Sequence, residues 1–216
     1  MASKSNSPTQ IWAHRVLQEL TTLYPVTSTA LHWETPFQLL IATILSAQCT
    51  DKRVNLVTPG LFSRWPTAQK MAQARQEDLE KAIHSTGFYR NKAKNILGAA
   101  QKLVQDHKGQ VPDQMLELTA LPGVARKTAN CVLGTAFGKE EGVVVDTHVG
   151  RLARRLGLTV EKNPIKVERD LMKLFPRSSW TRLSHLFIDH GRSTCTSRKA
   201  KCEECILREG CPKLLT

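Results

Sequence analysis

Apolar residues recur along most of this chain at the three- and four-residue spacing of helices that bury one face. In the segment 90–107 the apolar stripe consists of Ile96, Leu97, Ala100, Leu103 and Val104. The segment 37–48, FQLLIATILSAQ, is apolar on nearly every side, which predicts a buried central helix. The only strand-like run in the sequence, 142–145, is too short and isolated to build a sheet. The pattern therefore predicts an all-α fold.

Two of the predicted helices begin with a hydroxyl residue followed by proline. Ser7 precedes Pro8, and Thr35 precedes Pro36. A Ser or Thr side chain accepts a hydrogen bond from the first helical turn, and proline fits the first helical position. We expect a helix from Pro8 to about Tyr24 and another that begins at Asp51. Further helical patterns cover 67–74, 77–85, 90–107, 113–120, 125–137, 147–156, 164–174 and 180–191.

The charge of the chain suggests a polyanionic partner. The formal net charge is +12 and the sequence pI is about 9.7. A basic excess of this size favours DNA or RNA as the partner, although basic residues also serve solubility. No apolar run approaches the roughly 20 residues that span a bilayer. The first residues, MASKSNSPTQIW, lack the apolar stretch of a signal peptide, so we expect a soluble cytoplasmic protein.

Four of the six cysteines are crowded near the C-terminus. Cys195, Cys202, Cys205 and Cys211 give the pattern C-x6-C-x2-C-x5-C, and Pro212 follows directly. Clustered cysteines in an intracellular chain indicate a metal site before disulfides. Structural zinc usually uses two separated short pairs, whereas this motif has one C-x2-C pair with an outlier on each side. The spacing favours an iron–sulfur cluster. A zinc site remains the alternative.

Basic residues occupy the loop between the first two of these cysteines, namely Arg198, Lys199 and Lys201. They could simply offset the negative charge of a thiolate-bound cluster. A basic loop that is closed by a metal is, however, preorganised to contact phosphates. We favour the DNA-binding interpretation of this loop.

A Pro-Gly turn joins two predicted helices in the segment 121–130, LPGVARKTAN. Pro122 restricts one backbone angle, and Gly123 permits a turn that other residues resist. The following helix begins at once, so its free N–H groups could bind a phosphate without reading bases. Because Pro-Gly turns are common, an ordinary helix connection remains the alternative.

Lys127 lies in the first turn of the helix after this hairpin. The helix dipole and partial burial would both favour a neutral amine, which can attack a sugar carbon to form a Schiff base. A surface lysine that contacts phosphate is the alternative. Asp146 follows an apolar run and has two interpretations as well. It could cap the next helix, or its carboxylate could stabilise a developing sugar cation.

These motifs together resemble the endonuclease III family of helix–hairpin–helix DNA glycosylases. The matching segments are LSAQCTD at 45–51, LPGVARKTAN at 121–130, VDTHVGR at 145–151 and the cysteine motif at 195–211. The resemblance implies two helical lobes with DNA in the cleft between them. One lobe is a six-helix barrel domain at 29–139, with the helix–hairpin–helix at about 113–137. The other combines 1–28 with 140–216 and holds a [4Fe-4S] cluster.

The resemblance also implies an activity. The enzyme would be a bifunctional DNA glycosylase and AP lyase of base excision repair, acting on oxidised pyrimidines in duplex DNA. Lys127 would attack the anomeric carbon and expel the base, and Asp146 would assist. The Schiff base would then allow β-elimination and a nick. The target nucleotide must leave the stack first. Monomeric action is expected.

The same resemblance assigns DNA contacts. Gln48 would fill the gap left by the flipped base, and Phe88 stands where a Leu often enters the opposite strand. Amides of the hairpin would bind phosphate, at Gly123, Val124 and Ala125. Carbonyls that hold Na⁺ or K⁺ in some relatives match those of Thr119, Leu121 and Val124. Two residues depart from the family pattern, because Ala125 replaces a Gly and Phe88 replaces the Leu.

Two other functions stay open from the sequence. A related glycosylase could choose a different lesion, such as a pyrimidine dimer or a mismatch. A non-catalytic iron–sulfur DNA-binding protein is the second, although such a protein would need neither Lys127 nor Asp146. A relative that removes adenine opposite an oxidised guanine lacks the lysine nucleophile, so the presence of Lys127 argues against it.

Overall fold

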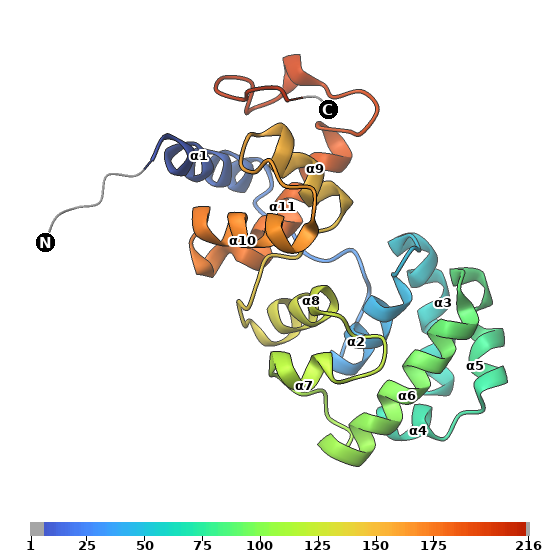
Figure 1. The fold of residues 1–216 in the computed structure, drawn as a ribbon. Coiled ribbons are helices and arrows are strands. Elements are labelled where there is room, and N and C mark those ends of the chain that lie inside the picture. Colours follow the sequence, from blue (N-terminus) through green and yellow to red (C-terminus); the bar gives the residue numbers. More distant parts are fainter. Residues whose placement is uncertain (1–6, 215–216) are drawn as a thin grey trace, which may run out of the picture. The chain divides into compact units, whose positions relative to one another are not determined.

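The computed structural model describes residues 7–214 and contains no strand within that range (Figure 1). The predicted all-α fold is confirmed. In chain order the elements are α1 (Pro8–Leu23), α2 (Pro36–Leu45), α3 (Asp51–Arg64), α4 (Ala68–Ala72), α5 (Gln76–Ile83), the 3-10 turn η1 (His84–Thr86), α6 (Tyr89–His107), α7 (Met115–Thr119), α8 (Arg126–Phe137), α9 (Thr147–Arg155), α10 (Pro164–Leu174), η2 (Arg177–Ser179), α11 (Trp180–Ser193) and η3 (Cys202–Glu204). Among the described residues, no helix is long and apolar enough to cross a membrane.

The chain divides into two compact units, each with its own apolar core. One unit joins the chain up to Ser28 with the chain from Gly142 onwards, and the other is Thr29–Glu141. The chain thus leaves the first unit, builds the second from one continuous segment, and returns. The expectation that the first residues, MASKSNSPTQIW, form no signal peptide falls partly on residues 1–6, which lie outside the described range.

The Thr29–Glu141 unit is built around α2. Thr35 caps this helix through its hydroxyl, which accepts from the Gln38 amide at 3.2 Å, and Pro36 begins it. Apolar side chains on every side of α2 are buried, as its sequence predicts. The helix packs against α3, α6 and α8, and α6 also packs against α4 and α5 (Figure 1). It ends at Leu45, three residues before the predicted end, because the chain turns at Gln48.

The unit formed by both ends of the chain contains α1 and α9–α11. Ser7 and Gln10 form a capping box at the start of α1, in which each side chain accepts from the other residue's amide. The apolar face of α1 packs against α10 and α11. The strand-like run 142–145 is extended without strand pairing. Its Val144 amide donates to the Ser184 hydroxyl at 2.9 Å instead of to a neighbouring strand.

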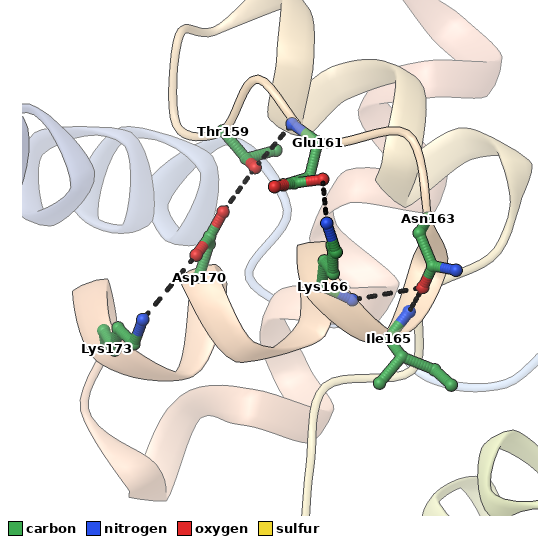
Figure 2. A network of polar contacts seen from close by, with 7 residues as sticks. All are labelled: Thr159, Glu161, Asn163, Ile165, Lys166, Asp170 and Lys173. Carbon is green, nitrogen blue, oxygen red and sulfur yellow. Dashed lines mark hydrogen bonds and ion pairs between the residues drawn. The ribbon is translucent and has the colours of Figure 1, made fainter.

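A polar network fixes the connection between α9 and α10 (Figure 2). The Thr159 hydroxyl donates to Asp170 at 2.6 Å and accepts from the Glu161 amide at 3.1 Å. Asn163 caps α10, with its side-chain oxygen 2.9 Å from the Ile165 amide. These bonds satisfy amides and hold the loop against its own helix, so α10 begins at a defined residue.

Three further predicted helices are shorter or divided in the structure. The patterns at 67–74 and 113–120 yield only the short helices α4 and α7. The pattern at 77–85 divides into α5 and the tighter turn η1. In each case the helix ends where the chain must turn toward the next element, which local periodicity does not encode.

Candidate nucleic-acid interface and catalytic residues

The hairpin before α8 has the features of a type II turn. The Val124 amide donates to the Leu121 carbonyl at 3.1 Å, Pro122 occupies the second position, and Gly123 has φ +76° at the third. A Cβ added at Gly123 would lie 2.8 Å from the Cβ of Asn95 on α6. Glycine is therefore required here twice, by the backbone angle and by the close approach of α6.

The N-terminus of α8 has no capping side chain. Its N-cap residue is Ala125, whose side chain cannot accept a hydrogen bond and so cannot cap the helix. Ala125 is exposed and has φ −84°, which alanine adopts without strain. The departure from Gly at this position thus adds a methyl group to an exposed surface and does not distort the hairpin.

Lys127 is the second residue of α8, as predicted, but its predicted partial burial is wrong because the residue is exposed. Its side chain is open to solvent, in the first turn of α8, where the helix dipole is positive.

Asp146 both caps α9 and meets a histidine. Its Oδ1 accepts from the Val149 amide at 2.8 Å, and its Oδ2 lies 3.3 Å from Nδ1 of His148. The carboxylate follows the buried Val145, as its sequence position predicts. Both proposed roles, cap and carboxylate, are thus compatible with one geometry. Lys127 belongs to the Thr29–Glu141 unit, and Asp146 belongs to the other.

Gln48 and Phe88 share an unusual backbone conformation. Both are exposed, Phe88 by 64%, and both have left-handed backbones, with φ +52° and +48°. A bulky residue with positive φ is uncommon, and such strain persists only where the surrounding structure fixes it. No sequence signal revealed this shared feature, because neither residue is a glycine or asparagine.

The four clustered cysteines line a single cavity with Arg155 and His190. No set of three or more His, Cys, Asp or Glu side chains within 7–214 is arranged to hold one metal ion. The exposed basic residues of the Cys195–Cys202 loop are Arg198, Lys199 and Lys201.

Arg155, on α9, organises this loop and was not singled out from the sequence. Its buried guanidinium donates to the carbonyls of Thr196 at 2.7 Å and Ser197 at 3.2 Å, and approaches Sγ of Cys195 at 3.6 Å. Its Nε is buried without a hydrogen-bond partner among the described residues. An arginine 40 positions before the first cysteine carries no sequence signal that links the two.

His190 was also missed. Its Nε2 lies 3.4 Å from Sγ of Cys205, and its Nδ1 lies 3.3 Å from the Tyr24 hydroxyl. Burial lowers the pKa of His190 to about 4, so the imidazole is neutral near pH 7. A neutral imidazole has one donor nitrogen. If Tyr24 donates to Nδ1, Nε2 donates to the sulfur.

Two of the four clustered cysteines, Cys205 and Cys211, have raised pKa values. Burial raises the pKa of Cys205 and of Cys211, a backbone amide lowers each, and the charges of neighbouring cysteines raise each further. Ionisation of Cys205 and Cys211 is therefore disfavoured unless a positive charge lies nearby.

The three carbonyls matched to an alkali-ion site lie along one stretch of chain. Thr119 ends α7, and Leu121 and Val124 are the first and last residues of the turn. The Leu121 carbonyl already accepts from the Val124 amide, and it retains a second lone pair.

Residues 41–177 match the HhH-GPD superfamily of base excision DNA repair proteins. This match covers more than half of the chain and defines its class. The endonuclease III of Synechocystis sp. is 55% identical over 212 residues, which cover 98% of this chain and 94% of that relative. The chain belongs to the endonuclease III family within that superfamily.

Two solved structures agree with this assignment. One is a non-covalent endonuclease III–DNA complex, with a TM-score of 0.90 and 40% identity. The other is a trapped covalent endonuclease III–DNA intermediate, an estranged-adenine complex, with a TM-score of 0.90 and 39% identity. Each comparison covers 96% of this chain and 97% of the other. The family expected from the sequence motifs is confirmed.

Proposed function

We propose that the chain is a bifunctional DNA glycosylase and AP lyase that excises oxidised pyrimidines from duplex DNA. The observation that carries the proposal is the place of Lys127. It lies on the exposed first turn of the helix that follows the Pro-Gly hairpin, in a family with a trapped covalent DNA intermediate among its solved structures. An exposed amine at a helix N-terminus without a capping side chain could reach a sugar carbon while the amides of that terminus hold the adjacent phosphate.

In the proposed reaction the neutral amine of Lys127 attacks the anomeric carbon of the flipped nucleotide. The glycosidic bond breaks, and the damaged base leaves with the bonding electron pair. The sugar ring then opens to a protonated Schiff base. Loss of a proton from the neighbouring sugar carbon expels the 3′ phosphate and nicks the strand. Asp146 stabilises the developing positive charge on the sugar and assists proton transfer, with its orientation fixed by Val149 and His148.

We further propose a [4Fe-4S] cluster held by Cys195, Cys202, Cys205 and Cys211. The donor set fits, because four soft thiols line one cavity beside a buried guanidinium with an unpartnered N–H. When bound, the cluster supplies the positive core that lets the thiols ionise together, and it closes the C-terminal loops. In this proposal the unit of both chain ends is the cluster domain, and the Thr29–Glu141 unit is the six-helix barrel domain.

The proposed DNA contacts come from four segments of the chain. Gln48 and Phe88 enter the stack at the damaged pair. The hairpin binds phosphate through the amides of Gly123, Val124 and Ala125, with Na⁺ or K⁺ held by the carbonyls of Thr119, Leu121 and Val124. The basic loop contacts phosphate through Arg198, Lys199 and Lys201.

Borohydride trapping tests the proposed chemistry. The native protein, Lys127→Ala and a matched control, Lys102→Ala, are each incubated with a duplex that contains one oxidised thymine. We expect a covalent protein–DNA band with the native protein and the control, and none with Lys127→Ala, which should still bind the duplex. A trapped band with Lys127→Ala would exclude Lys127 as the nucleophile. Trapping only on a pyrimidine dimer or a mismatch would support the Schiff-base mechanism but would contradict oxidised pyrimidines as the substrate.

A further inference from the structure

Lys92 is a buried lysine that the proposed chemistry does not use. It lies in the first turn of α6 and is only 4% exposed. Its Nζ donates to the Leu45 carbonyl and to the Thr86 carbonyl, each at 2.8 Å. Lysine is seldom fully buried unless it is paired, so these two bonds require a physical explanation.

Both carbonyls end helical elements. Leu45 is the last residue of α2, and Thr86 is the last residue of η1. Carbonyls at a helix C-terminus lack intrahelical partners and lie at the negative end of the dipole, where a cation is favourable. Burial lowers the pKa of Lys92, and the neighbouring Cys49 raises it. The ammonium thus satisfies two backbone acceptors from elements that are 41 residues apart in sequence (45 and 86).

Each of these carbonyls comes shortly before an exposed residue with a left-handed backbone. Gln48 follows Leu45 by three residues, and Phe88 follows Thr86 by two. The backbone amide of Lys92 also donates to the Phe88 carbonyl, at 3.0 Å. Left-handed backbone is strained for a residue with a Cβ, so both conformations depend on such anchoring.

We propose that Lys92 is a positioning residue that ties the Gln48 loop and the Phe88 loop to α6, so that both side chains enter the DNA as one unit. This inference rests on the proposed function, in which these two residues contact DNA at the damaged pair. One side chain fills the gap left by the flipped nucleotide while the other opens the opposite stack. The two must therefore hold a defined separation. A single buried cation with two acceptors sets that separation without itself touching DNA.

Lys92→Met tests this role, because methionine fills similar volume and cannot donate. Lys102→Met on the exposed face of the same helix is the matched control. We expect the single-turnover excision rate on a duplex lesion to fall about 10- to 100-fold for Lys92→Met and to stay within about twofold for Lys102→Met. A fluorescent base opposite the lesion should brighten when native protein binds and should not brighten with Lys92→Met.

A double-mutant cycle separates positioning from general destabilisation. If Lys92 acts through the two loops, Lys92→Met should slow excision by less than about twofold in a Gln48→Ala, Phe88→Ala background. The proposal would be overturned if Lys92→Met slowed excision by the same factor in both backgrounds, or if Lys92→Met alone excised at the native rate. If Lys92→Met does not fold, Lys92→Gln, whose shorter side chain carries no charge, is tested in the same cycle with the same criteria. Failure of the native protein to excise any base would instead refute the proposed function.

Discussion

The imidazole of His148 lies beside the carboxylate of Asp146, with 3.3 Å between Nδ1 and Oδ2. The other carboxylate oxygen accepts from the Val149 amide at the start of α9. Each oxygen thus has a partner on the same helix, which restricts rotation of the side chain. A carboxylate that is fixed in this way needs no reorganisation as positive charge develops nearby.

Substitutions of Asp146 should separate the cap from the chemistry. Asn is as good an N-cap as Asp, so Asp146→Asn should change the free energy of unfolding by less than about 0.5 kcal/mol. Asp146→Ala should destabilise by about 1 kcal/mol because the cap is lost. Both should lower single-turnover excision by about 10²- to 10⁴-fold, since both remove the charge. Chemical unfolding and single-turnover assays measure the two effects.

The N-cap of α10 offers the control for this experiment. Asn163 accepts from two amides, at 2.9 Å and 3.4 Å, in the same unit as Asp146. Asn163→Ala should cost about 1 kcal/mol of stability and leave excision unchanged. Native excision by Asp146→Asn would reduce Asp146 to a structural cap.

Gly123→Ala should weaken both the fold and DNA binding. The new Cβ adds left-handed strain of about 1–2 kcal/mol and also meets Asn95, which must move. Gly138→Ala, at the other end of α8, is the control, because that glycine has φ +63° and open space around its Cβ position. We expect Gly138→Ala to lower stability through backbone strain alone and to leave the DNA affinity native. Equal affinity losses from both substitutions would contradict a specific role for the hairpin.

Helix starts could be predicted from the sequence because their chemistry is local. Ser7, Thr35 and Asp146 each accept from an amide within the next three residues. The identity of each side chain predicts that hydrogen bond, because these residue types are the preferred N-caps. Helix ends were predicted less accurately than helix starts. The turn at Gln48 depends on the neighbouring elements that fix its left-handed backbone.

The residues that support the candidate site were hidden for a related reason. Lys92 bonds a carbonyl 47 positions away, and Arg155 bonds a loop 41 positions away. Such partners are set by packing, which periodicity and spacing do not report. The predicted burial of Lys127 failed similarly, since a position in the first turn of a helix does not determine exposure. Motifs located the chemistry, and the fold alone located the groups that hold it in place.

Loss of one cluster ligand should remove colour and stability together. Cys202→Ala should abolish visible absorbance and lower the melting temperature, because the closed loops contribute to folding only while the cluster holds them. Cys131→Ala is the control, since Cys131 lies in the other unit and away from this cavity. An unchanged melting temperature after the colour is lost would show that the cluster does not stabilise the fold. A colourless native protein that contains zinc would exclude the iron–sulfur assignment.

The basic loop should contribute to the salt dependence of DNA binding. Substitution of Arg198, Lys199 or Lys201 by Ala should each lower the slope of log affinity against log salt by about 0.9, because one fewer counterion is released per phosphate contact. Lys173→Ala is the control, since that exposed lysine pairs with Asp170 on α10 at 3.8 Å. Fluorescence anisotropy over a range of salt concentrations on an undamaged duplex measures the slope. A slope that is unchanged in all three variants would mean that these charges only offset the thiolates.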